Sequence, residues 1–64
     1  MLDQYAKAIT DEYNVWHKQY QDAEGNGNTL NMSIAAFFCN AISNAVIGSS
    51  HPEVKEYFQK HAAV

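Results

Sequence analysis

The segment from Asn31 to Gly48, NMSIAAFFCNAISNAVIG, constrains the fold more than any other part of the chain. It contains no charged residue, and its apolar side chains occur around almost the whole circumference of the helix that it predicts. A helix that is apolar nearly all round is normally buried on every side. A chain of 64 residues has little material with which to bury it. The way in which this helix is covered is therefore the central question.

A membrane is one way to cover such a helix. A transmembrane span needs about 20 predominantly apolar residues, whereas residues 30–47 give 18 positions, five of which are polar. We therefore expect no membrane contact. The chain also begins Met1-Leu2-Asp3, without the basic segment that opens a secretory signal. A cytoplasmic location is expected on these grounds.

Two further helices are predicted beside this one. Apolar residues recur at steps of three and four from Leu2 to Ala23, which predicts a helix over 2–23. The glycine- and asparagine-rich run 24–28 is expected to end it. Asn28 or Thr29 can then cap a helix over 29–47, and Gly48 stands where a left-handed glycine commonly follows a helix.

A third helix is predicted over 51–62. Ser50-His51-Pro52-Glu53 fits the capping box S-x-x-E, in which the serine and glutamate side chains satisfy backbone N–H groups at a helix start. Three helices joined by short loops predict antiparallel neighbours. The expected fold is all-α, a small helical bundle forming a single domain over residues 1–64.

The bundle is expected to be completed by self-association. A domain this small buries only roughly 60% of the surface that its unfolded chain exposes, so it usually needs a disulfide, a metal or a partner. The single cysteine, Cys39, excludes an internal disulfide. We expect a homodimer or higher oligomer with 29–47 at its centre, where small residues permit close approach and asparagine specifies register. The expected contact residues are Ser33, Phe37, Asn40, Ala41 and Asn44. The alternative is a monomer in which the other two helices cover this one.

No group of residues predicts a catalytic or metal site. Cys39 has no lysine or histidine within a helical turn, so an inert thiol is expected. The three histidines lack the close spacing typical of zinc ligands. The run Asp22 to Asn28 resembles the first half of an EF-hand calcium loop, but the twelfth position, normally a bidentate glutamate, is Ser33. We expect no cofactor, no metal and no enzymatic activity.

Aromatic residues are the candidates for contact with a different protein. Tyr13, Trp16 and Tyr20 share one stripe of the first helix, and Tyr57 lies on the third. Tyrosine and tryptophan are enriched at protein interfaces. Nucleic acid is disfavoured as a partner, because the net charge is −3 and the chain has no arginine.

These observations favour a small non-enzymatic protein that binds an unidentified protein partner. We expect a regulatory protein of the adaptor or inhibitor type, acting as a homo-oligomer. Compact chains without a catalytic constellation are common among phage and mobile-element accessory proteins. Small size is the only basis for associating this chain with such proteins. The alternative is a dimeric helix-turn-helix-like DNA-binding protein, suggested by the short turn between residues 47 and 52.

Overall fold

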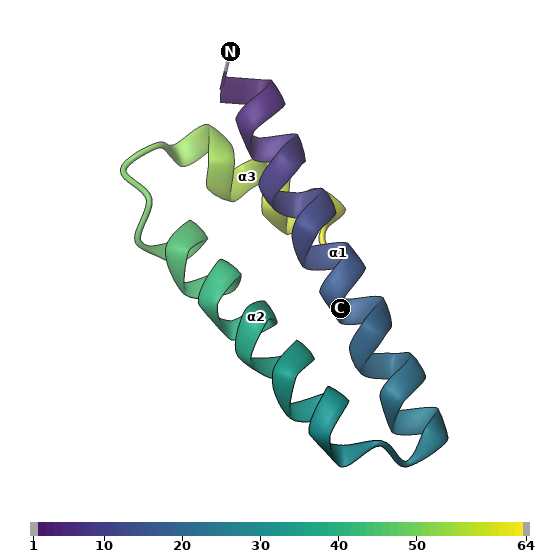
Figure 1. Cartoon of the computed structure of the whole chain (residues 1–64). Coiled ribbons are helices and arrows are strands. Elements are labelled where there is room, and N and C mark those ends of the chain that lie inside the picture. Colours follow the sequence, from purple (N-terminus) through teal and green to yellow (C-terminus); the bar gives the residue numbers. More distant parts are fainter. Residues whose placement is uncertain (1, 64) are drawn as a thin grey trace.

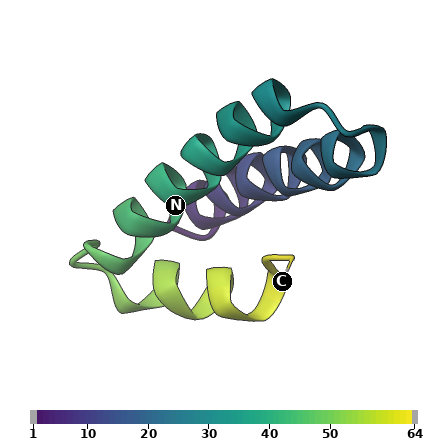
Figure 2. The same ribbon diagram turned by 90° about the horizontal axis from the view of Figure 1, so that it is seen from below.

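The computed structural model describes residues 2–63 and confirms the all-α fold with three helices. They are α1 (Leu2–Asn26), α2 (Thr29–Ile47) and α3 (Pro52–His61). The first two form an antiparallel hairpin (Figure 1). The third helix lies across one face of that hairpin and stops well short of the α1–α2 turn (Figure 2). The chain is elongated, with extents of 38 × 17 × 16 Å.

α1 is three residues longer than the predicted helix 2–23. Gly25 remains helical, and the turn falls instead at Gly27, which has φ +69°. The Asn28 N–H donates to the Ala23 carbonyl at 2.9 Å, and the Gly27 N–H donates to the Glu24 carbonyl at 3.2 Å. These bonds satisfy carbonyls at the helix end, and they need a residue in the left-handed region at position 27. Glycine permits a helix to end but does not require it, so the predicted run 24–28 does end the helix, but at Gly27 and not at residue 23.

The remaining caps agree with the sequence in part. Asn28 caps α2 as predicted, because its Oδ1 accepts from the Asn31 N–H at 3.1 Å. Gly48 is at the other end, but its φ of −79° is right-handed, so the predicted left-handed cap is wrong. The predicted capping box is also wrong, since His51 is the N-cap of α3 and makes no side-chain capping bond. A residue before proline is driven toward extended conformations, which starts the helix at Pro52 and leaves Ser50 outside it.

The two glycines near the first turn provide a matched test of this geometry. We expect Gly25→Ala to raise the free energy of unfolding by about 0.4–1 kcal/mol, because the site is helical and a Cβ there meets no atom within 4 Å. Gly27→Ala should lower it by at least about 1 kcal/mol, because alanine disfavours positive φ. Chemical denaturation at one fixed protein concentration measures both. Equal effects of the two changes would contradict the position of the turn.

The core of the chain contains small side chains. The described residues that are fully buried are Ala6, Thr10, Ala23, Ala35, Val46 and Val54. Among residues 2–63, every leucine, isoleucine, phenylalanine and tryptophan stays at least partly exposed. Small residues let the helices approach closely, but they bury little apolar area. Since burial contributes about 25 cal/mol per Å², this core stabilises a single copy weakly.

Aromatic packing and one asparagine hold α3 on the hairpin. Tyr13 and Phe58 pack edge to face with ring centroids 4.9 Å apart. The Asn14 Nδ2 donates to the His61 carbonyl at 3.2 Å, and its Oδ1 accepts from the Ala63 N–H at 2.7 Å. Asn14 thus satisfies backbone groups at the C-terminal end of α3 from the middle of α1. This bond pair is a long-range restraint on where α3 lies.

Thr10 carries a cost that can be removed. Its Oγ1 is fully buried and has no hydrogen-bond partner among the described residues. A buried unsatisfied polar group costs about 1–3 kcal/mol. We expect Thr10→Val, which keeps the side-chain shape, to raise the free energy of unfolding by about 1–2 kcal/mol. Thr10→Ser, which keeps the hydroxyl and loses a methyl group, should lower it. A Thr10→Val protein less stable than wild type in denaturant titration would contradict this account.

Candidate interaction surface

One side of α2 is apolar and uncovered. We call it the outer face and define it by residues that are all exposed: Leu30, Ile34, Phe37, Ala41, Asn44 and Ala45. The exposed fractions of Leu30 and Phe37 reach 70% and 68%. Neither α1 nor α3 packs on this face, because the residues that α2 buries, Ala35 and Val46, lie on the opposite side. The outer face is therefore available to another molecule.

The spacing along the outer face is that of a helix seam. Starting from Leu30, the steps to Ile34, Phe37, Ala41 and Asn44 are four, three, four and three residues. This alternation is the heptad spacing of helices that pack lengthwise against one another. The sequence-based prediction included Phe37, Ala41 and Asn44 but missed Leu30 and Ile34. The four-three spacing that begins at Leu30 was the signal that could have found them.

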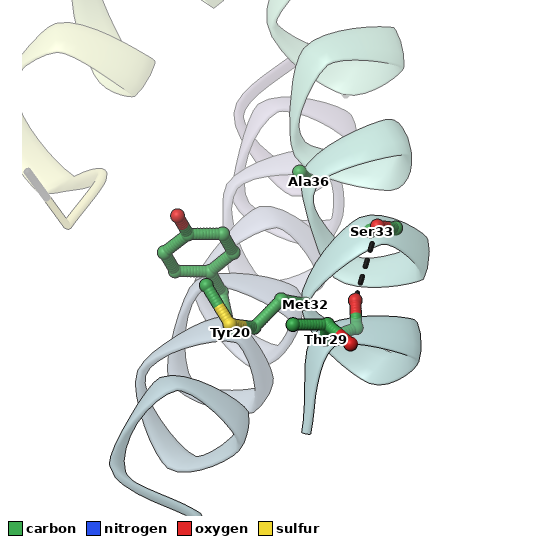
Figure 3. Close-up of a pocket in the computed structure, with 5 residues that line it drawn as sticks. All are labelled: Tyr20, Thr29, Met32, Ser33 and Ala36. Atoms are coloured by element: carbon green, nitrogen blue, oxygen red, sulfur yellow. Dashed lines mark hydrogen bonds between the residues drawn. The ribbon is translucent and has the colours of Figure 1, made fainter. Parts of the chain in front are cut away.

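The other two predicted contact residues lie beside the outer face. Ser33 and Asn40 are exposed on α2, toward the side on which α3 lies. The Ser33 Oγ donates to the Thr29 carbonyl at 3.0 Å, so its hydrogen bond is made within the helix (Figure 3). All five predicted residues are thus accessible. Their role in self-association stays a prediction.

Trp16 links α1 to the edge of the outer face. Its ring stacks on Phe38 with centroids 4.3 Å apart and an interplanar angle of 12°. Phe38 in turn meets Phe37 edge to face at 5.6 Å. The Trp16 Nε1–H donates to Glu12 Oε1 at 3.1 Å, which satisfies its polar atom. Trp16 therefore supports the α2 aromatic residues rather than standing alone on the surface.

The three predicted tyrosines do not share one surface with Trp16. Tyr13 is half-buried between α1 and α3. Tyr57 lies beside His61 on α3, with ring centroids 4.3 Å apart. Tyr20 lines a hollow between α1 and α2 together with Met32 and Ala36 (Figure 3). Of the four aromatic candidates, Tyr20 lines this open depression.

This depression continues the surface on which α3 packs. Two adjoining hollows of about 240 and 270 Å³ share Tyr20 and Ala36, and we call them together the open groove. Its other lining residues are His17, Thr29, Met32, Ser33, Cys39 and Asn40. Farther along α2, Ser43 and Ile47 line a third hollow against α3. Since Ala36, Asn40, Ser43 and Ile47 follow one helical stripe, the groove is the half of that stripe that α3 is too short to cover.

The electrostatics of α2 are neutral along its whole length. No aspartate, glutamate, lysine or arginine occurs between Glu24 and Glu53. The most apolar 18-residue window of the helix has a mean hydropathy of 1.5, and 11% of that window is buried. By length and composition α2 is therefore a helix that could cross a membrane. Core helices of soluble proteins can have the same length and composition, so these properties do not distinguish the two cases. The expectation of no membrane contact stays a prediction.

No cluster suited to a metal occurs in the described part of the chain. No group of three or more histidine, cysteine, aspartate or glutamate side chains comes together within residues 2–63. The run that resembled a calcium loop is helical from Asp22 through Asn26. Its oxygen atoms therefore point around a helix instead of converging. On α3, the basic Lys55 is half-buried, and its near neighbours in sequence include the acidic Glu53 and Glu56.

Cys39 lines the open groove in a partly buried position. Burial raises the pKa of its thiol above the usual value. Burial also raises the pKa of Tyr13, and the nearby charge of an ionised Cys39 adds to this increase. Both shifts favour the neutral forms of these two side chains. A thiol with a raised pKa is a poor nucleophile at neutral pH.

The raised pKa of Cys39 predicts slow alkylation. At any pH below its pKa, the folded chain contains less thiolate than the unfolded chain, so native protein should react more slowly with iodoacetamide than denatured protein at the same pH. The same shift should make the free energy of unfolding fall as the pH rises above the ordinary cysteine pKa, because the folded state keeps its proton longer. Cys39→Ser should remove that part of the pH dependence. Faster alkylation of the native chain would contradict the predicted inert thiol.

Comparison with known proteins adds no family to this description. No protein-family model matches the chain, and neither the curated proteins nor the solved structures yield a match.

Proposed function

We propose that this chain is a small non-enzymatic regulatory protein of the adaptor or inhibitor type, which acts as a homo-oligomer and binds another protein. One observation carries the proposal: three large apolar side chains, Leu30, Ile34 and Phe37, are exposed in succession on the outer face of α2, while the described residues that are fully buried include none of comparable size. A folded chain that exposes its larger apolar residues is incomplete as a single copy. A second copy is the partner that is always present.

The surface area of the chain supports the same proposal. A folded monomer of 7.2 kDa is expected to expose roughly 4100 Å². This chain exposes 4596 Å². Contiguous exposed apolar patches of this kind mark interaction sites in soluble proteins. A stable interface buries about 800 Å² on each partner, and a helix face 19 residues long can supply much of that area.

The open groove supports the binding of a different protein. Its lining includes the apolar side chains of Met32, Ala36 and Cys39, and Tyr20 adds an aromatic ring with a polar hydroxyl. Tyrosine in such a position is typical of binding hot spots. The groove borders the outer face at Ser33 and Asn40 and otherwise lies on a different side of α2, so the outer face can assemble the copies while the rest of the groove binds the partner.

Self-association is tested by sedimentation equilibrium over about a hundredfold dilution of wild type and Phe37→Asp, since mass action makes a dimer depend on concentration. We expect wild type to be a dimer or larger. Each Phe37→Asp copy loses about 1.5–3 kcal/mol of apolar burial. Because both copies carry the change, the dissociation constant should rise at least about a hundredfold.

Val15→Asp is the matched control. Val15 is an exposed apolar residue on α1, with an exposed fraction of 53%, and it lies away from α2. This variant places the same charge on a different surface and should associate like wild type. Circular dichroism of both variants checks that the helices are intact. A monomeric wild-type chain at the highest concentration would refute the proposed self-association.

A further inference from the structure

The outer face of α2 changes in side-chain size along its length. Leu30, Ile34 and Phe37 occupy its N-terminal half, whereas Ala41, Asn44 and Ala45 occupy its C-terminal half, and Gly48 continues the same stripe. All of these residues are exposed. The face is thus wide and apolar at one end and nearly flat at the other. A partner helix that fills it evenly must have the opposite gradient.

A second copy of α2 has this gradient when it runs antiparallel. Pairing positions whose numbers sum to 78 places Phe37 opposite Ala41, Ile34 opposite Asn44, and Leu30 opposite Gly48 of the second copy. Each large side chain then meets a small residue or glycine, which is the alternation that fills a helical core without gaps. A two-fold interface makes every such contact twice. In a parallel pair, large would meet large at one end and small would meet small at the other, and a void would separate the small ends.

Resting on the proposed self-association, we infer that two copies of this chain pair through antiparallel α2 helices centred between Phe37 and Ala41. The absence of charge from α2 makes this pairing free of repulsion along the seam. The antiparallel order also sets opposite helix dipoles side by side. Asn44 lies opposite Ile34, beside Ser33 of the second copy, whose hydroxyl is a partner for its amide.

This arrangement determines where the open grooves lie in the dimer. A two-fold axis that relates antiparallel helices is perpendicular to both of them, so it leaves both α3 helices on the same face of the assembly. The open groove lies on the α3 side of each hairpin. Both grooves therefore open toward the same side, and a dimer presents two copies of the partner site in one direction. A parallel pair would place them on opposite faces.

Site-specific disulfides distinguish the two arrangements. In a Cys39→Ser background, Ile34→Cys and Asn44→Cys are prepared as separate variants, mixed in equal amounts and oxidised at a concentration at which sedimentation shows a dimer. Positions 34 and 44 of one copy are about 15 Å apart along the helix, well beyond the reach of a disulfide. We expect the mixture to give cross-linked heterodimer in roughly tenfold excess over homodimer of either variant.

The other outcomes each overturn the inference in a recognisable way. Homodimer cross-links of each variant alone would show a parallel pair, which leaves the proposed self-association intact. A dimer in sedimentation with no cross-link in any mixture would show that another face mediates it. A monomer that floats with phosphatidylcholine vesicles would refute the proposed function as well, because the outer face would then be covered by lipid. Leu30→Cys, which forms a homodimer cross-link only in the parallel arrangement, is a second check.

Discussion

A ten-residue α3 cannot cover a nineteen-residue α2 that is apolar around most of its circumference, and the rest of the structure depends on this mismatch. α1 occupies one side of α2 along its length, and α3 occupies part of a second side. What remains is the outer face and the open groove. Both surfaces are direct results of having too few residues to enclose a helix of this composition.

The packing between the helices is close because the residues there are small. Ala6, Thr10, Val46 and Val54 are almost completely buried, yet they contribute little apolar area. The larger aromatic residues instead lie around the edges, as Tyr13 does against Phe58 and Trp16 does against Phe38. The large apolar residues exposed outside this core are the ones that the proposed self-association would cover. The unsatisfied Thr10 hydroxyl adds a further cost to a core with little apolar burial.

Periodicity in the sequence predicted the number and order of the helices well, because long stripes at steps of three and four are strong signals. The residues at which the helices end were harder to predict. Residue type does not indicate which of Gly25 and Gly27 ends α1, because both are glycine. The end depends on which backbone carbonyls the turn satisfies with hydrogen bonds. The capping box predicted at Ser50 was wrong because Pro52 restricts the backbone conformation of His51. The S-x-x-E motif does not include this steric effect. On the outer face, the predicted contact residues include Phe37, Ala41 and Asn44, whereas Leu30 was left out because its place on that face shows only in the four-three spacing.

The lack of charge on α2 would affect the rate at which two copies associate. Protein pairs with complementary charges attract each other over a distance and can associate at up to about 10⁸–10⁹ M⁻¹s⁻¹, whereas neutral surfaces reach only about 10⁵–10⁶ M⁻¹s⁻¹. Two copies of this chain would meet without electrostatic attraction at α2, and each carries a net charge of −3. Encounters would therefore be unguided, and at low abundance newly made chains would spend a long time alone. In the proposed dimer the amount of protein would set how often copies meet, and added salt would speed assembly by screening the repulsion between two net charges of −3.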